Sequence, residues 1–160
     1  MLNRRNLLRQ TAIAGVAGLA LPNSLLAAGL KGIELTAMRG SISASDLGVR
    51  PGALDDQSRA FAKMLAEASD RNIPVFLPAG TYVVSNLTLP PNLRLSGVPG
   101  ATRIVYGGDG HLMAAEDAVH IEMSGLVLDG ANRWMGDYAQ GLLDLRRVAH
   151  AVIDNCQIVG

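Results

Sequence analysis

The stretch MSGLVLDG, residues 123–130, returns thirty residues later as IDNCQIVG, residues 153–160. In both copies apolar residues alternate with polar or small ones, which is the period-two pattern of a β-strand with one buried face. The pairs that coincide at this interval are Leu112 and Leu142, Met113 and Leu143, His120 and His150, Met123 and Ile153, Leu126 and Cys156, and Leu128 and Ile158. A period of about 20 to 50 residues is typical of stacked repeats, because equivalent positions of successive units pack on one another.

Short apolar runs follow one another after Pro74, and most of them are bounded by Gly, Pro, Asn or Asp. This punctuation indicates short β-strands joined by tight turns. A weaker echo of the repeat pairs LRLSG, residues 93–97, with IEMSG, residues 121–125. Strands of this kind build a sandwich, a barrel or a solenoid. The fixed spacing favours the solenoid and predicts one coil of a parallel β-helix per repeat; chance recurrence of the octet is the alternative.

One amphipathic helix is predicted before the strands, over about residues 56–71. Its apolar stripe recurs at positions i, i+3, i+4 and i+7 and comprises Phe61, Met64, Leu65 and Ala68. Glu67 and Arg71 have the spacing of an ion pair on the solvent side. Asn72 and Pro74 are expected to end the helix. The coils are then expected from about residue 73.

Two consecutive aspartates, Asp55 and Asp56, precede this helix. They are interpreted as its N-terminal cap, because a carboxylate there accepts backbone N–H groups and faces the positive end of the helix dipole. A catalytic acid and base is the alternative interpretation. The helix itself is expected to cover the open end of the first coil, because solenoids need such caps.

The N-terminus has the features of an export signal. A basic segment is followed by a short apolar run, residues 12–21, which is too short for a membrane span of about 20 residues. The paired arginines and the leucines after them resemble the twin-arginine signal and are Arg4, Arg5, Leu7 and Leu8. Asn3 stands where that family usually has Ser or Thr. The resemblance implies a signal peptide over residues 1–28, recognition by the twin-arginine (Tat) translocase, and a periplasmic or secreted protein; an ordinary secretory signal or an uncleaved anchor is the alternative.

Composition excludes several classes of function. The chain has 160 residues, a formal net charge of zero and an apolar share of 49%, which is typical of one globular domain. No basic patch indicates nucleic-acid binding. A single cysteine, Cys156, excludes an internal disulfide and a cysteine-based zinc site, and it is expected to face the core. The residues indicate no cofactor or resident metal, and we expect no stable membrane span.

The order of the pieces resembles a known family. ASDLGVRPGALDDQSRAF, residues 44–61, leads into the helix, and IPVFLPAGTYVVSNLTL, residues 73–89, follows it. The stretches DLGV, DD and above all PAGTY resemble the start of the pectate-lyase-like families, which include rhamnogalacturonase- and polygalacturonase-type proteins. With the signal in front, the chain is also similar to Tat-translocated repetitive proteins of bacteria. The resemblance covers about residues 43–130 and extends more loosely to residue 160. Gly80 within PAGTY permits a turn with positive φ.

The resemblance implies a right-handed, single-stranded parallel β-helix with an N-terminal cap helix. A linker over residues 29–45 would precede the β-helix part, residues 46–160, which we expect to be a truncated piece of a longer protein. In full length such a protein would bind polysaccharide or degrade it by hydrolysis, elimination or epimerisation, with catalytic residues outside this segment. A calcium ion is possible as a cofactor only by analogy with members of this family. A non-catalytic periplasmic or surface scaffold is the competing interpretation.

Several single residues are candidates for chemistry. Asp129 is interpreted as a turn cap, with substrate contact as the alternative. Asp144 is expected to form a surface ion pair with Arg146. His120 and His150 are expected to stack on adjacent coils and face solvent; metal binding or acid–base chemistry would need further ligands. The GDGH stretch, residues 108–111, is interpreted as a turn, and the polygalacturonase signatures are absent.

The segment ANRWMGDYAQ, residues 131–140, interrupts the strand pattern and is predicted to be a loop. Trp134 and Tyr138 have flat rings that can stack on sugars. The alternative is that Trp134 packs back on the outer face of the coil. The glycan-contact candidates are therefore Asp129, Trp134 and Tyr138.

Overall fold

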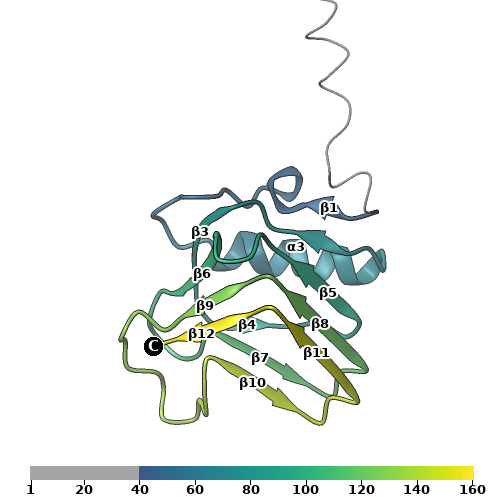
Figure 1. The fold of residues 1–160 in the computed structure, drawn as a ribbon. Coiled ribbons are helices and arrows are strands. Elements are labelled where there is room, and N and C mark those ends of the chain that lie inside the picture. The colour runs from purple at the N-terminus through teal and green to yellow at the C-terminus, as the bar shows by residue number, and fades with distance from the viewer. Residues whose placement is uncertain (1–39) are drawn as a thin grey trace, which may run out of the picture. The chain divides into compact units, whose positions relative to one another are not determined.

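The computed structural model describes residues 40–160, which form three parallel β-sheets, one α-helix and one short 3-10 helix (Figure 1). Sheet 1 contains β1 (Ile42–Ser43), β2 (Val75–Phe76), β5 (Leu93–Ser96), β8 (His120–Ser124) and β11 (His150–Asp154) in this order. Sheet 2 contains β3 (Gly80–Val84), β6 (Thr102–Tyr106), β9 (Val127–Asp129) and β12 (Gln157–Val159). Sheet 3 contains β4 (Leu87–Thr88), β7 (Met113–Glu116) and β10 (Leu143–Arg146). The export-signal residues Arg4, Arg5, Leu7 and Leu8 lie outside the described residues.

Successive strands from β2 to β12 visit sheets 1, 2 and 3 in a fixed cycle. All pairs of neighbouring strands within residues 40–160 are parallel, so each return to a sheet adds one strand beside the previous one. Parallel strands cannot be joined by a tight hairpin and need a long connection. Here the strands of the other two sheets form that connection.

The register predicted from the thirty-residue repeat is confirmed. Met113 pairs with Leu143, His120 with His150, Met123 with Ile153 and Leu128 with Ile158. The echo between residues 93–97 and 121–125 is confirmed as well, because Leu93 pairs with Ile121 and Leu95 with Met123. Similar residues recur at these intervals because they lie at paired positions of neighbouring strands.

The core combines the inward-facing side chains of all three sheets with buried apolar residues from the segment 44–68. Strand β8 shows the alternation, since Ile121 and Met123 are buried while His120, Glu122 and Ser124 are partly exposed. Leu128 on β9 is buried, whereas its register partner Ile158 on β12 is 61% exposed. Cys156, expected to face inward, is partly buried and packs against the core.

The α-helix, α3, spans Ser58–Asp70 and buries the predicted stripe Phe61, Met64, Leu65 and Ala68. It packs against β3, β4 and β5, and Phe61 meets the buried ring of Tyr82 edge to face at 6.2 Å. Arg71 Nη1 lies 3.2 Å from Glu67 Oε1, which confirms the predicted ion pair. No helix within residues 40–160 has the length and apolar character needed to span a membrane.

The ends of α3 differ in detail from the prediction. The helix begins at Ser58 with Gln57 at the N-cap position, and Asp56 Oδ1 accepts the N–H of Ser58 at 2.7 Å. Asp55 is not a cap: its Oδ2 lies 2.8 Å from Arg50 Nη2. At the other end Asn72 has a φ of 50°, and the N–H groups of Asn72 and Ile73 return to the carbonyls of Ser69 and Ala68. This is the Schellman arrangement, in which a left-handed residue satisfies the last carbonyls.

A short ordered segment precedes the helix. Strand β1 and the 3-10 helix η1 (Ala44–Leu47) lie at the start of the described residues, and β1 overlaps the segment interpreted as linker. Ile42 pairs with Val75 on β2. In β3, Gly80 has a φ of 152°, and an added Cβ would lie 2.6 Å from the Cβ of Pro51. The glycine of PAGTY is therefore required by a close approach as well as by its backbone conformation.

Candidate functional site

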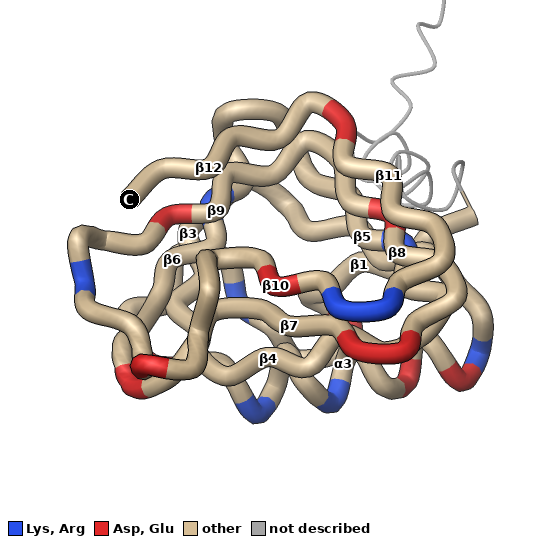
Figure 2. The backbone as a smooth tube through the Cα atoms, turned by 90° about the horizontal axis from the view of Figure 1, so that it is seen from below, with Lys and Arg blue, Asp and Glu red and all other residues tan. Residues whose placement is uncertain are grey.

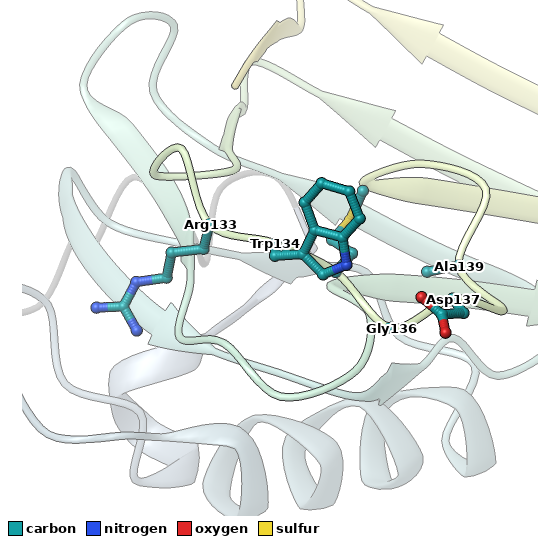
Figure 3. Close-up of a pocket in the computed structure, with 6 residues that line it drawn as sticks. Arg133, Trp134, Gly136, Asp137 and Ala139 are labelled. Atoms are coloured by element: carbon teal, nitrogen blue, oxygen red, sulfur yellow. The ribbon is translucent and has the colours of Figure 1, made fainter.

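The loop between β9 and β10 carries the most accessible aromatic side chain among the described residues. It lines a pocket of about 400 Å³ whose walls are Arg133, Trp134, Met135, Gly136, Asp137 and Ala139. Figure 3 shows the indole of Trp134 between the side chains of Arg133 and Asp137. Trp134 is 89% exposed, so it does not pack back on the strands, which was the alternative considered from the sequence. The flat ring is free to contact a ligand.

One backbone and one side-chain hydrogen bond join this loop to residues 107–110, and one further backbone bond lies within the loop. The N–H of Gly136 donates to the carbonyl of Gly110 at 2.7 Å, and the N–H of Ala139 donates to Gly136 at 2.8 Å. The guanidinium of Arg133 donates to the carbonyl of Gly107. The loop that interrupts the strand pattern is therefore bonded to the preceding turn of the chain.

The turn at residues 108–111 is confirmed. Gly108, Asp109 and Gly110 all have positive φ values, which only glycine and short polar residues adopt readily. Asn86 holds the turn from the preceding strand connection: its Nδ2 donates to the carbonyl of Asp109 at 2.5 Å, and its Oδ1 accepts the N–H of His111 at 3.2 Å. The turn therefore presents His111 at a defined position beside β7.

His111 and Tyr138 meet although 27 residues separate them. His111 Nδ1 lies 3.4 Å from the Tyr138 hydroxyl, and the two rings are edge to face at 5.9 Å. Both line a second pocket of about 120 Å³, together with Ala114, Ala115, Glu116, Ala139, Asp144 and Arg146. The sequence indicated Tyr138 but not His111, whose only signal was its place after a glycine-rich turn.

The ion pair of Asp144 and Arg146 is confirmed, and it is less exposed than expected. Arg146 Nη2 lies 2.5 Å from Asp144 Oδ2, and Arg146 Nε donates to Oδ1 at 3.2 Å. The Asp144 side chain is only 13% exposed. The hydrogen bonds and the charge of Asp144 raise the pKa of Arg146. The Asp144 carboxylate is thus paired through both oxygens with Arg146 on the same strand.

Asp129 acts as the predicted turn cap. Its Oδ1 accepts the N–H of Ala131 at 2.8 Å, and its Oδ2 lies 2.6 Å from Arg103 Nη1 on β6. The hydrogen bond from Ala131, followed by that from Arg103, lowers the pKa of the Asp129 carboxyl. Both carboxylate oxygens of Asp129 thus accept hydrogen bonds from other residues of the protein, which is the contact pattern of a structural residue.

Arg147, Glu116 and Asp117 form an ionic cluster that the sequence did not indicate. It joins the segment between β10 and β11 to the end of β7 and the residue after it. Figure 2 shows a basic segment between β10 and β11 beside an acidic segment between β7 and β8. Arg147 pairs there with Glu116, the last residue of β7, and with Asp117, thirty residues earlier in the chain. The bond from Arg147 lowers the pKa of Asp117, and both acidic partners raise that of Arg147. The thirty-residue interval that aligns the apolar positions also brings Arg147 onto Asp117.

The outer face of sheet 1 is polar. Asn72, Asn92, Arg94, His120 and Glu122 line a shallow pocket of about 530 Å³. His120 Nε2 lies 3.7 Å from Glu122 Oε2, and His150 follows His120 in register with its side chain exposed. Both histidines therefore face outward as predicted. Within residues 40–160 no group of three or more His, Cys, Asp or Glu side chains has an arrangement that could hold a metal ion.

Comparison with models of protein families gives no match, and comparisons with curated proteins and with solved structures give none either. The candidate function therefore rests on the residues and their geometry. Within residues 40–160 the candidate binding surfaces are the pocket beside Trp134, the smaller pocket beside His111, and the outer face of sheet 1. The first combines an exposed indole with one basic and one acidic side chain.

Proposed function

We propose that this chain is part of an exported, right-handed parallel β-helix protein of the pectate-lyase-like type, and that it binds polysaccharide through Trp134 and Tyr138. The strand cycle through three parallel sheets supports the coil architecture. The right hand follows from the strong preference for right-handed crossovers between parallel strands. Helix α3 would act as the cap, since its apolar stripe packs on the first strands of the cycle.

The observation that carries the proposal is the 89% exposure of Trp134 beside a pocket. An indole in water forgoes the free energy of apolar burial, and a ligand that covers it recovers this free energy. Sugar rings suit the position, because their C–H faces are apolar and their hydroxyls need hydrogen-bond partners. Arg133 and Asp137 supply a donor and an acceptor on either side of the indole. Tyr138, which is 61% exposed, extends the aromatic surface.

Asp129 is assigned a supporting role rather than direct sugar contact. Its carboxylate holds the first residue of the loop through the N–H of Ala131 and anchors it to Arg103. A sugar hydroxyl would have to replace one of these bonds. The residue therefore contributes to binding by positioning the loop that carries Trp134.

The test is retention on polysaccharides. Native affinity electrophoresis in gels that contain a neutral or an acidic polysaccharide should retard the protein, and Trp134→Ala should weaken retention by about tenfold, since stacking on an aromatic ring contributes roughly 1 kcal/mol or more. Leu54→Ala is the matched control, because Leu54 is 94% exposed on a different loop. Equal retention of the wild-type protein and Trp134→Ala, or no retardation by any polysaccharide, would contradict the proposal.

Export is proposed on the N-terminal residues alone. Arg4, Arg5, Leu7 and Leu8 would be read by the Tat translocase, which delivers the protein to the periplasm or the exterior. Replacing Arg4 and Arg5 by lysine should leave the protein unprocessed in the cytoplasm while a fusion to a general secretory signal restores export. Normal export of the lysine variant would assign the ordinary secretory route instead.

A non-catalytic scaffold is the second candidate, and one observation favours it over an enzyme. Asp117, Asp129 and Asp144 each pair with an arginine, so these carboxylates have structural partners. If the full-length protein is a hydrolase, lyase or epimerase, its acid and base would come from residues outside this segment. Product analysis after incubation of the full-length protein with the retained polysaccharide separates the two: a scaffold leaves the polymer length and composition unchanged.

A further inference from the structure

His120 on β8 and His150 on β11 lie at paired positions of two neighbouring parallel strands. Paired residues of a sheet project from the same face, and neighbouring strands lie about 5 Å apart. That face is the outer one, because the next residue of β8, Ile121, is buried while His120 is partly exposed. The two imidazoles therefore project from adjacent positions on the outer face of sheet 1.

Both imidazoles are accessible to a ligand from solution. The His120 side chain is 36% exposed and lines the shallow pocket of about 530 Å³, and His150 is exposed. The nearest charged group to His120 Nε2 is Glu122 Oε2 at 3.7 Å, which is longer than a hydrogen bond. Within residues 40–160 neither imidazole is held by a hydrogen bond to the protein. Their rings are therefore free to rotate toward a common ligand.

Two adjacent neutral imidazoles match the coordination chemistry of divalent transition metals. Imidazole nitrogen is a common ligand of zinc, copper and nickel, and it binds zinc at about 2.0–2.1 Å. Two nitrogens on one ion then lie about 3 Å apart, a separation that rings on strands about 5 Å apart reach by side-chain rotation. No group of three or more suitable side chains exists within residues 40–160, so water would fill the other coordination positions.

The neighbours of the two histidines suit a hydrated cation. Glu122 lies on the same face of β8 as His120, and its carboxylate can accept a hydrogen bond from a ligating imidazole or from metal-bound water. The amide of Asn92, which lines the same pocket, is a further partner for such water. The guanidinium of Arg94, which also lines the pocket, donates from Nη2 to the carbonyl of Asn72 at 2.8 Å. The carboxylate of Glu122 has no arginine or lysine bonded to it, so its charge favours a cation here.

We infer that His120 and His150 together chelate one divalent transition-metal ion, with zinc and copper as the best-suited ions, and that Glu122 supports the site through its carboxylate. The ion keeps water in its open positions, so it is exchangeable and not a closed structural metal. Magnesium and calcium do not fit, because they require oxygen ligands. The inference is independent of the proposed polysaccharide binding, since neither histidine lines the pocket beside Trp134.

Imidazole ¹⁵N NMR of the full chain during titration with Zn²⁺ tests this directly. The chain has three histidines, and His111 serves as the internal reference because its Nε2 is buried. The signals of His120 and His150 should shift together along one saturating curve that ends at a single ion per chain, while His111 stays unchanged. Mg²⁺ at the same concentration should shift none of them. Separate curves for the two histidines, a shift of only one, or an equal response to Mg²⁺ would overturn the inference.

Variants distinguish a chelate from two independent weak sites. His120→Asn and His150→Asn should each lower the Zn²⁺ affinity by about tenfold or more, since even outer partners of metal ligands contribute about 10–100-fold. The double variant should lose little beyond either single variant, because one imidazole alone cannot chelate. Asp154→Asn is the matched control: it removes an exposed charge from β11 and should leave the affinity unchanged.

Glu122→Gln should reduce the Zn²⁺ affinity less than either histidine variant does, because its carboxylate does not ligate the ion. Circular dichroism checks that each variant is folded, and the corresponding glutamine variants of His120 and His150 replace any asparagine variant that is not. An unchanged affinity of the folded His150 variant, or a double variant whose loss is the full product of the two single losses, would overturn the chelate.

Discussion

Arg103 Nη1 on β6 lies 2.6 Å from Asp129 Oδ2 on β9, so one ion pair joins two neighbouring strands of sheet 2. The other carboxylate oxygen caps the turn that begins the Trp134 loop. Charge-assisted bonds to a carboxylate stabilise its ionised form and lower its pKa. Asp129 therefore links the pairing of two strands in sheet 2 to the position of the loop that carries Trp134.

Asp129→Asn should lower the free energy of unfolding at neutral pH by about 1 kcal/mol, because a partly exposed charged hydrogen bond is replaced by a weaker one. The pKa of Asp129 is lowered in the folded state, so its contribution is present above the unfolded value of about 4 and is lost as the pH falls below it. Urea unfolding between pH 2 and 7 should show a shallower acid loss in the variant. Asp137→Asn, at an exposed position, is the control and should behave as wild type.

Gly80→Ala should destabilise the protein by about 1–3 kcal/mol, as is usual when a methyl group is forced into a filled space. The added Cβ would lie 2.6 Å from the Cβ of Pro51. Gly141→Ala is the matched control, because the nearest atom to its added Cβ is 3.9 Å away. Thermal unfolding measures both. Replacing Pro51 by Gly in the Gly80→Ala background should recover part of the loss, and a fully additive double variant would contradict the contact.

Tyr82→Phe should change the alkaline stability of the protein. Burial raises the pKa of Tyr82 to about 12, from about 10 in the unfolded chain. The folded state therefore holds this proton more tightly, and the associated stability is present below about pH 10 and lost as the pH rises through 12. The variant gives up the hydroxyl bond to the Pro78 carbonyl, about 1 kcal/mol at neutral pH, but should lose less between pH 10 and 12. Tyr138→Phe, at an exposed ring, should retain the wild-type alkaline loss.

Two positions that are equivalent in the repeat should respond very differently to truncation. Leu128 is 1% exposed and Ile158, its register partner, is 61% exposed. Leu128→Ala should cost about 2–5 kcal/mol, the range for a large core side chain. Ile158→Ala should cost about 0.5 kcal/mol or less in this chain, as for an exposed position. Equal losses in urea unfolding would mean that β12 is covered in solution.

The spacing of the strand pairs explains which parts of the fold were predictable. The pairs Met123–Ile153 and Leu128–Ile158 share one interval of thirty residues, so the repeat is visible in the sequence. Val75 pairs with Leu95 only twenty residues away, and Leu93 pairs with Ile121 at twenty-eight. Because the turns of the chain differ in length, the earlier strands align only weakly with the later ones. Their existence was predicted from alternation and turn residues, but their register needed the structure.

The candidate site was predicted in part for a similar reason. A loop with two aromatic residues is a local feature, so Trp134 and Tyr138 were found from the sequence. His111 was not, because its contact with Tyr138 joins two residues that are 27 positions apart along the chain. Asp144 and Arg146 were correctly paired, since two residues along a strand share one face.

The sequence by itself determined the strand periodicity, the apolar stripe of the helix and the thirty-residue register. Alternation and the helical stripe are patterns within one short segment, and the repeat spacing is visible because strands that pair in register have similar residues at a fixed interval. The tertiary structure alone decided that Trp134 is exposed, that Asp144 is nearly covered and that His111 Nε2 has no hydrogen-bond partner within residues 40–160. Exposure and hydrogen-bond satisfaction depend on which distant segments lie over a side chain. The connection at residues 130–142 folds back on the turn at residues 107–111, and no local pattern in either segment encodes that contact.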